Sequence, residues 1–305
     1  MASLQGMGGM ATEVTRVYQF GALESRLRRC QDRNAMFEDP EFASDLAQRL
    51  DEMLSDAGSA PVLSLDVFDT LLLRDDSSEL TRFFEIGNEM AGVASSRLSL
   101  TTTQQDAFLA RHMGTKATYR CRDRIKGFGE GSLTEIHQTA SRILCGTSEL
   151  VEDFIAAELD YERRRTTVNQ ALAVYMREIR SRGGRVALIT DMYMHANHVE
   201  NLLSSHGISP DSYDYLVSSA DQIVSKASGK LFAIVEEALS AKPGEFVHVG
   251  DSLKGDMQRP LEQGWQALHL PIATGGLQKR RTDHLRTASH LLEAFGLNVD
   301  IAMPK

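Results

Sequence analysis

One stretch of the sequence, residues 62–72, constrains the fold of this chain more than any other. Its first residues are mostly valine and leucine and lead into Asp66, which is the pattern of a buried strand in a parallel sheet. A carboxylate at the end of a buried strand is costly unless a cation compensates it or a reaction uses it. In open α/β sheets, ligands bind just outside such strand ends. The stretch therefore predicts a parallel sheet and the position of a functional site.

The rest of the chain divides into segments of different pattern. Residues 1–60 predict a loose tail and accessory helices, with an apolar helical face over residues 42–54. Residues 75–168 have helical spacings and contain no convincing strand. From residue 169 onward, helix and strand patterns alternate at short intervals, which predicts right-handed βαβ units. The segment 276–305 predicts a C-terminal helix that packs on the outside.

Together these segments predict one architecture, an α/β fold. Its core is a doubly wound, Rossmann-like parallel sheet built from residues 61–74 and 169–275, with a helical cap (75–168) inserted after the first core strand. After the first strand, strands are expected at 185–190, 215–218, 246–250 and 266–270. The helices expected near the sheet are 171–182, 195–206, 230–239 and 257–263, and the strongest part of the C-terminal helix is 283–295.

Composition and charge exclude several classes of protein. The chain has 305 residues and a formal net charge of −9, which argues against a general nucleic-acid binder. It has no apolar run of the roughly 18 residues that a membrane helix needs. Its three cysteines are far apart and form no CxxC pair, so they indicate neither a disulfide framework nor a zinc site. We therefore expect a cytoplasmic protein that has no nucleic-acid or membrane partner, and the sequence leaves its oligomeric state open.

Polar residues follow the predicted strands at four places. A parallel sheet brings the carboxyl ends of its strands to one edge, so these residues can share a site although they are far apart in sequence. Several carboxylates with a lysine and hydroxyl groups indicate a hard cation such as Mg²⁺ together with a phosphate. The residues are Asp66, Asp69 and Thr70 after the first strand; Thr190 and Asp191; Lys226; and Asp251, Ser252 and Asp256.

These places resemble, in order, the four motifs of the haloacid dehalogenase-like (HAD) hydrolase superfamily. Residues 62–70 resemble the first motif, with Asp66 at the position of the nucleophile, and Thr190 resembles the phosphate-binding hydroxyl of the second. Lys226 is similar to the lysine of the third motif. Gly250-Asp251-Ser252 with Asp256 resembles the acidic fourth motif. The insertion between the first and second motifs resembles a C1-type cap.

The resemblance implies an Mg²⁺-dependent phosphohydrolase that acts on a small phosphorylated, or otherwise anionic, substrate. Asp66 would attack phosphorus and form an aspartyl-phosphate. Asp66, Asp251 and the main-chain carbonyl of Phe68 would hold the metal ion. Asp256 would orient Lys226 or a metal-bound water. The residues that would stabilise charge on the transferred group are Lys226, Thr190 and Thr70.

The first motif departs from the family pattern at Phe68. Phosphatases of the family usually have a second aspartate at this position, which protonates the leaving group. Asp69 is one residue further on and compensates only if the turn rotates it inward; otherwise it makes hydrogen bonds within the turn. Asp191 is a second candidate for proton transfer, and otherwise it caps the following helix. Arg74 either reaches a substrate anion or closes the loop.

Several functions therefore remain open at this point. One alternative is a catalytically weak or non-catalytic phosphate-binding module; another is cleavage of a C–P or C–halogen bond. A phosphonate hydrolase of this family would need a cap lysine, and the available ones are Lys116 and Lys126. The basic stretch from Arg111 to Lys126 is expected to be a solvated helix face, with an additional anion site as the alternative.

Overall fold

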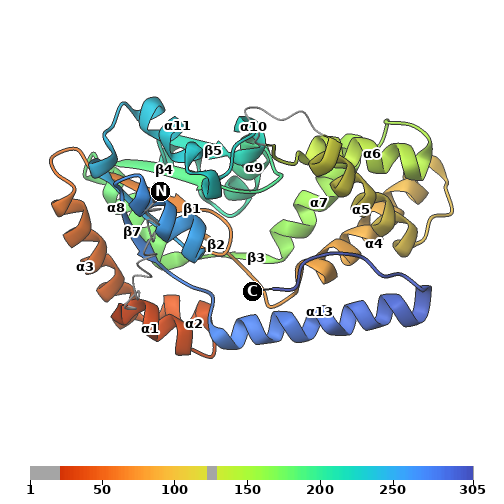
Figure 1. The fold of residues 1–305 in the computed structure, drawn as a ribbon, viewed down its shortest axis with the longest axis horizontal. Helices are drawn as coiled ribbons and strands as arrows, with labels where there is room; N and C mark the ends of the chain where they lie inside the picture. The colour runs from red at the N-terminus through yellow and green to blue at the C-terminus, as the bar shows by residue number, and fades with distance from the viewer. Residues whose placement is uncertain (1–20, 122–128, 305) are drawn as a thin grey trace, which may run out of the picture.

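The protein is described by a computed structural model that places residues 21–121 and 129–304 (Figure 1). The predicted N-terminal tail and Lys126 therefore lie outside the described residues. The main sheet has five parallel strands in the order β5-β4-β1-β6-β7. Its central strand β1 (Val62–Asp66) pairs with β4 (Arg185–Thr190) on one side and with β6 (Phe246–Gly250) on the other. The predicted doubly wound parallel sheet is confirmed.

The strand order places a topological switch point beside β1. From β1 the chain moves to β4 and then to β5 (Tyr215–Ser218), and afterwards crosses back to β6 and β7 (Gln266–His269). Loops leaving β1 and β6 therefore diverge in opposite directions, and a crevice opens at their carboxyl ends.

Alternating residues of the strands face two helical layers. Val186 and Leu188 belong to the larger apolar core, which includes α3 (Pro40–Asp56) and α8 (Gln170–Ser181). Ala187 and Ile189 face the smaller core, which is closed by α11 (Lys230–Leu239). Both faces of the sheet are buried, and this accounts for the continuous apolar runs in its sequence. Helix α9 (Ala196–Ser205) contacts β5, and its buried Val199, Leu202 and Leu203 belong to the larger core.

Three short helical segments precede the sheet: α1 (Ala22–Arg29), α2 (Arg33–Glu38) and α3. The carboxylates of Asp32 and Asp39 cap α2 and α3 by accepting hydrogen bonds from backbone N–H groups in the first turns. The predicted apolar face of α3 is buried, and the helix ends before Gly58, whose φ is +103°. The buried residues of that face are Phe42, Leu46, Leu50, Met53 and Leu54.

Four helices form the insertion between the first two strands of the main sheet. They are α4 (Glu79–Leu98), α5 (Gln104–Cys121), α6 (Leu133–Cys145) and α7 (Val151–Arg164), and they lie beside the sheet in Figure 1. The insertion is entered and left through a small antiparallel pair, β2 (Leu72–Arg74) and β3 (Thr166–Val168), which the sequence did not predict. Each strand has only three residues, too few for a periodicity to stand out.

The C-terminal helix α13 (Thr274–Phe295) is longer than the predicted 283–295. It runs along the lower edge of the molecule in Figure 1 from α2 to beneath α4, and it packs against both α1 and α4. The predicted helix 257–263 is instead a π-helical turn, Leu253–Gln258, followed by the short α12 (Arg259–Glu262). No helix in the described part of the chain is long and apolar enough to cross a membrane.

Candidate active site

A line of buried polar side chains connects three strand ends. The Lys226 ammonium donates to Asp66 Oδ1 at 2.5 Å and to Asp256 Oδ1 at 2.6 Å. His248 Nε2 lies 3.0 Å from the same oxygen of Asp256, and its Nδ1 lies 2.8 Å from Ser64 Oγ. The predicted core position of His248 is correct, and its contacts fix Asp256, which in turn positions Lys226.

Local backbone geometry brings Asp256 into this line. Lys226 begins a 3₁₀ turn (Lys226–Ser228), and Asp256 belongs to the π-helical turn that follows β6. The backbone N–H of Ser252 donates to Asp256 Oδ2 at 2.9 Å. Gly250 permits this approach, because a Cβ there would lie 2.3 Å from the Asp256 carboxyl carbon.

Three carboxylates converge at the same place. Oxygens of Asp66, Asp251 and Asp256 lie within 4.8 Å of one another. Burial raises the pKa of Asp66 to about 7 although Lys226 acts in the opposite direction. Burial, reinforced by the carboxylates of Asp69 and Asp66, raises the pKa of Asp251 well above its usual value. The buried negative charge therefore exceeds what Lys226 compensates, and the oxygen donor set suits Mg²⁺.

The carboxylates open into a cavity of about 310 Å³ at the switch point. The cavity brings together every candidate site residue from the sequence except Thr70. Thr70 is fully buried, and its side chain favours the ionised form of Asp66 by lowering the pKa of that carboxyl group. The lining includes Asp66, Phe68, Asp69, Arg74, Thr190, Asp191, Lys226, Asp251 and Asp256.

The tight turn after β1 gives Asp69 an ionic partner that the sequence did not reveal. Asp69 has a φ of +57°, and its carboxylate accepts hydrogen bonds from both terminal nitrogens of Arg280, at 2.7 and 3.1 Å. Burial by itself would raise the pKa of Asp69, but Arg280 holds it at about 2. The carboxyl group is thus ionised at neutral pH and cannot donate a proton.

Asp191 does not cap the following helix, so that interpretation is wrong. Helix α9 begins at Ala196 and has His195 at its N-cap. Asp191 is exposed, and its Oδ2 accepts a hydrogen bond from the backbone N–H of Lys226 at 3.2 Å. Asp191 therefore helps to hold the loop that carries the lysine.

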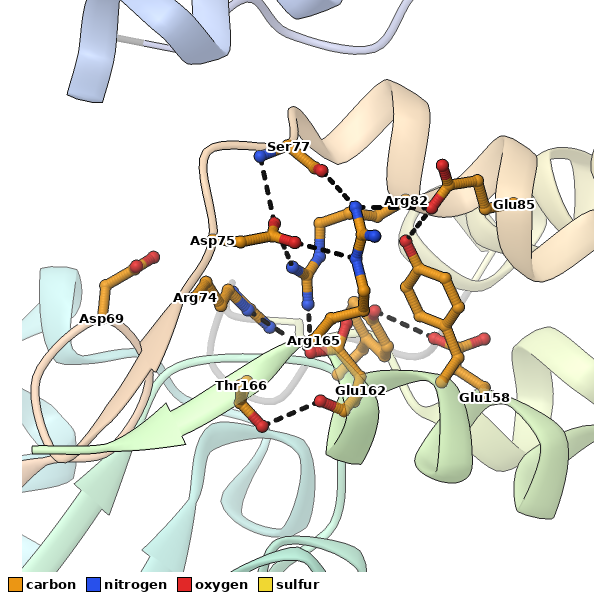
Figure 2. Close-up of polar contacts among 12 residues, drawn as sticks. Asp69, Arg74, Asp75, Ser77, Arg82, Glu85, Glu158, Glu162, Arg165 and Thr166 are labelled. Carbon is orange, nitrogen blue, oxygen red and sulfur yellow. Dashed lines mark hydrogen bonds and ion pairs between the residues drawn. The ribbon is translucent and has the colours of Figure 1, made fainter. Parts of the chain in front are cut away.

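Arg74 lies where β2 enters the insertion. Its Nε is 3.4 Å from Glu162 Oε2 on α7, and its guanidinium carbon is 4.3 Å from the centre of the Phe68 ring. Figure 2 shows Arg74 among the charged side chains that join β2, β3 and α7. Arg74 thus contacts the loop and also lines the cavity, which is compatible with both of its predicted roles.

Residues outside the four motifs clamp the two active-site loops. Arg33 on α2 donates to the backbone carbonyls of Asp69 (2.5 Å) and Leu270 (2.6 Å). His269 Nε2 lies 2.7 Å from the backbone carbonyl oxygen of Asp251, and His269 Nδ1 lies 2.7 Å from Glu24 on α1. Among these clamping residues, only His269 lies in a predicted strand, near its carboxyl end, where site residues are expected.

The basic stretch of α5 differs from its prediction. Arg111 is fully buried, so a solvated helix face is wrong for this residue. Lys116 is ion-paired with Asp300 in the C-terminal segment at 2.5 Å. Arg122, Arg124 and Lys126 lie outside the described residues.

The fold and the site define a Rossmann-like protein with an acidic, lysine-containing pocket at its switch point. A family model described as haloacid dehalogenase-like hydrolase matches residues 62–258, about two thirds of the chain. The chain therefore belongs to the haloacid dehalogenase-like hydrolases. The clamping residues Glu24, Arg33, His269 and Arg280 all lie outside the matched segment.

Several solved structures are similar in fold, at low sequence identity. An L-2-haloacid dehalogenase from Xanthobacter autotrophicus is 14% identical, with 81% of this chain and 95% of that chain covered and a TM-score of 0.47. A HAD family enzyme from Bacteroides thetaiotaomicron is 15% identical, with 70% and 94% covered and a TM-score of 0.45. No curated protein matches the sequence.

Proposed function

We propose that this hydrolase is an Mg²⁺-dependent phosphohydrolase that acts on a small phosphorylated metabolite through an aspartyl-phosphate. The observation that carries the proposal is the convergence of the carboxylates of Asp66, Asp251 and Asp256, two of which, Asp66 and Asp256, are paired with Lys226. Such a cluster has an excess of buried negative charge, which a divalent cation would offset. A phosphorylated substrate adds further negative charge and would be bound through that cation and Lys226.

In the proposed reaction, the nucleophile, the metal ligands and the phosphate-binding groups are separate sets of residues that overlap only at Asp66. Asp66, at the end of β1, is the nucleophile, and its Oδ1 is held by Lys226. Asp66, Asp251 and the main-chain carbonyl of Phe68 are the proposed ligands of the metal ion, with Asp256 beside them. When bound, Mg²⁺ would neutralise charge between the nucleophile and the phosphoryl group. Lys226 and Thr190 would bind the phosphoryl oxygens, with Thr70 and Asp191 as further candidates.

Other parts of the proposal concern the surroundings of the site. Helices α4–α7 would act as a cap that selects the substrate, because they enter and leave the core next to the cavity-lining Arg74. A cytoplasmic location is supported by the three cysteines, all of which are unpaired. We expect neither a nucleic-acid nor a membrane partner.

The test is phosphate release by the purified protein across a broad panel of phosphorylated metabolites, with Mg²⁺ or with a chelator. We expect Mg²⁺-dependent turnover and a loss of at least about 1,000-fold in Asp66→Asn. Asp211→Asn, at an exposed site, is the matched control and retains activity. Full activity of Asp66→Asn would refute the proposal, and metal-independent halide release from the same preparation would point to C–halogen cleavage instead.

A second candidate function rests on Phe68, which supplies no proton. On this hypothesis the protein binds phosphate esters and hydrolyses them poorly. Phe68→Asp would then raise hydrolysis of model phosphate esters by about 100-fold or more. Phe68→Leu, which introduces no acid, is the control. Efficient hydrolysis by the natural protein, unchanged in Phe68→Asp, would contradict this second function.

A further inference from the structure

The side of the cavity where a phosphatase of this family keeps its proton donor is built here from Phe68 and Arg74. Both side chains line the cavity together with the nucleophile Asp66. The guanidinium of Arg74 stands over the Phe68 ring, 4.3 Å from its centre. The ring can orient the guanidinium through a cation–π contact, and it offers no exchangeable proton.

The charge of Arg74 is only partly used by the protein. Its single ion-pair partner in the described residues is Glu162, whose Oε2 lies 3.4 Å from Nε, and its two terminal nitrogens make no hydrogen bond to a described residue. Glu162 is itself bound by Arg82 in an ion pair that is almost completely buried. Asp69, the other nearby carboxylate, is already occupied by Arg280. Arg74 therefore retains hydrogen-bond donors for an anion in the cavity.

A guanidinium and a carboxyl group stabilise a leaving group in different ways. The guanidinium stays protonated at neutral pH and cannot supply a proton, but it binds planar oxyanions with two parallel hydrogen bonds. Asp69 does not replace the missing acid, because Arg280 donates a hydrogen bond to each of its two carboxylate oxygens, at 2.7 and 3.1 Å. An alkoxide leaving group needs a proton as it departs, so this site stabilises it poorly. A carboxylate or a phosphate leaves as a stable anion, which the guanidinium can bind.

We propose that Arg74 is a catalytic residue that receives an oxyanion leaving group, and that the substrates are phosphoric anhydrides, either acyl phosphates or phosphoanhydrides. The inference rests on the proposed phosphohydrolase function and specifies its substrate class. Phe68 replaces the proton donor because an anhydride requires none, and the ring holds Arg74 in place.

The bonds and charges of the proposed reaction balance without a proton donor. An oxygen of Asp66 bonds to phosphorus while the bond from phosphorus to the bridging oxygen breaks, and its electron pair leaves with the carboxylate or phosphate. That anion pairs with Arg74. Water then bonds to phosphorus, the bond to Asp66 breaks, and its electron pair returns to the carboxylate. Hydrogen phosphate forms, and one proton of the water passes to solvent.

The test compares leaving groups in the Mg²⁺-loaded protein and in Arg74 variants. The probes are acetyl phosphate, pyrophosphate and glycerol 2-phosphate, followed by phosphate release, and the variants are Arg74→Gln and Arg74→Lys. Arg97→Gln is the matched control, because Arg97 is exposed on α4 and its ion-pair partner among the described residues is Asp153 on the surface.

We expect the natural protein to hydrolyse at least one anhydride about 100-fold faster than glycerol 2-phosphate. Arg74→Gln should lower kcat on that anhydride by about 100-fold, and Arg74→Lys, which restores the charge but not the two parallel hydrogen bonds, should regain part of the activity. Acetyl phosphate and pyrophosphate separate a carboxylate from a phosphate leaving group. Thermal unfolding of each variant checks the fold, which Arg74→Gln should preserve because Glu162 keeps its buried ion pair with Arg82.

Two results would overturn the inference while the proposed function stands. One is Mg²⁺- and Asp66-dependent turnover of glycerol 2-phosphate that equals that of both anhydrides. The other is anhydride turnover by a folded Arg74→Gln protein within about twofold of the natural one, since removal of a donor to a developing anion costs far more. No phosphate release from any substrate, or release unaffected by Asp66→Asn, refutes the phosphohydrolase function itself.

Discussion

Two buried clusters of charged side chains use similar residue types and differ in their charge balance. In the insertion, Arg111 binds Glu158 through two hydrogen bonds of 2.5 and 2.7 Å, and His137 and Tyr193 complete the cluster at 2.9 and 3.0 Å from Glu158. In the core, the carboxylates of Asp66, Asp251 and Asp256 lie close together, and Lys226 pairs with Asp66 and Asp256.

The direction of the pKa shifts separates the two clusters. Burial would raise the pKa of Glu158, but Arg111 lowers it below its usual value. The pKa values of Asp66 and Asp251 are raised instead. A balanced cluster stabilises the fold in its charged form, whereas an unbalanced one favours the bound state, in which a cation offsets the excess. Buried charge that no neighbouring group compensates, rather than buried charge as such, therefore indicates function.

The largest expected effect comes from unbalancing the insertion cluster. Glu158→Gln leaves the buried Arg111 without its counter-charge and should lower the free energy of unfolding by about 3–5 kcal/mol, measured in urea. Arg111→Met/Glu158→Leu removes both charges and should recover most of that loss. The control is Glu89→Gln, which breaks a surface pair with Arg164. Equal stability of Glu158→Gln and the natural protein would break the comparison.

In the core cluster, removal of a charged group is expected to raise the free energy of unfolding rather than lower it. Because the pKa of Asp251 is raised by folding, its contribution to stability falls as the pH rises above about 4, the ordinary value of an aspartate. At pH 8 in chelator, Asp251→Asn should therefore raise the free energy of unfolding by about 1 kcal/mol. Mg²⁺ should stabilise the natural protein and leave the variant unchanged. A metal-free Asp251→Asn protein that is less stable than the natural one would contradict the surplus of charge.

A third effect concerns Asp69, whose charge is compensated by Arg280 as that of Glu158 is by Arg111, and its expected size lies between the other two. Its pKa is lowered to about 2, so its stabilising contribution is present above the unfolded value and is lost as the pH falls from about 4 to 2. Asp69→Asn should cost roughly 2 kcal/mol at pH 7 and flatten acid unfolding in this window. Asp160→Asn, on an exposed helical pair, is the control. If the acid-unfolding profile of Asp69→Asn matched that of the natural protein, Arg280 would not lower the pKa of Asp69 in the folded state.

Much of the fold could be predicted because its signals are local. The strands 185–190, 215–218 and 246–250 are found at their predicted bounds, since each is an apolar run closed by turn residues. The short hinge strands β2 and β3 were missed for lack of length. The helix expected at 257–263 is α-helical at 259–262, but it is preceded by a π-helical turn from Leu253, in which the Asp256 carboxylate accepts a hydrogen bond from the Ser252 backbone N–H.

The sequence alone determined the strand that ends in Asp66, the order of the strand-end motifs and the departure at Phe68. These follow from residues that are neighbours in the chain, where apolar period and motif spacing carry the information. Only the tertiary structure decided that Arg280 neutralises Asp69, that Arg111 is buried against Glu158, and that Arg74 stands over Phe68. These are side-chain encounters between separate elements, and their charge balance depends on which groups folding removes from water together.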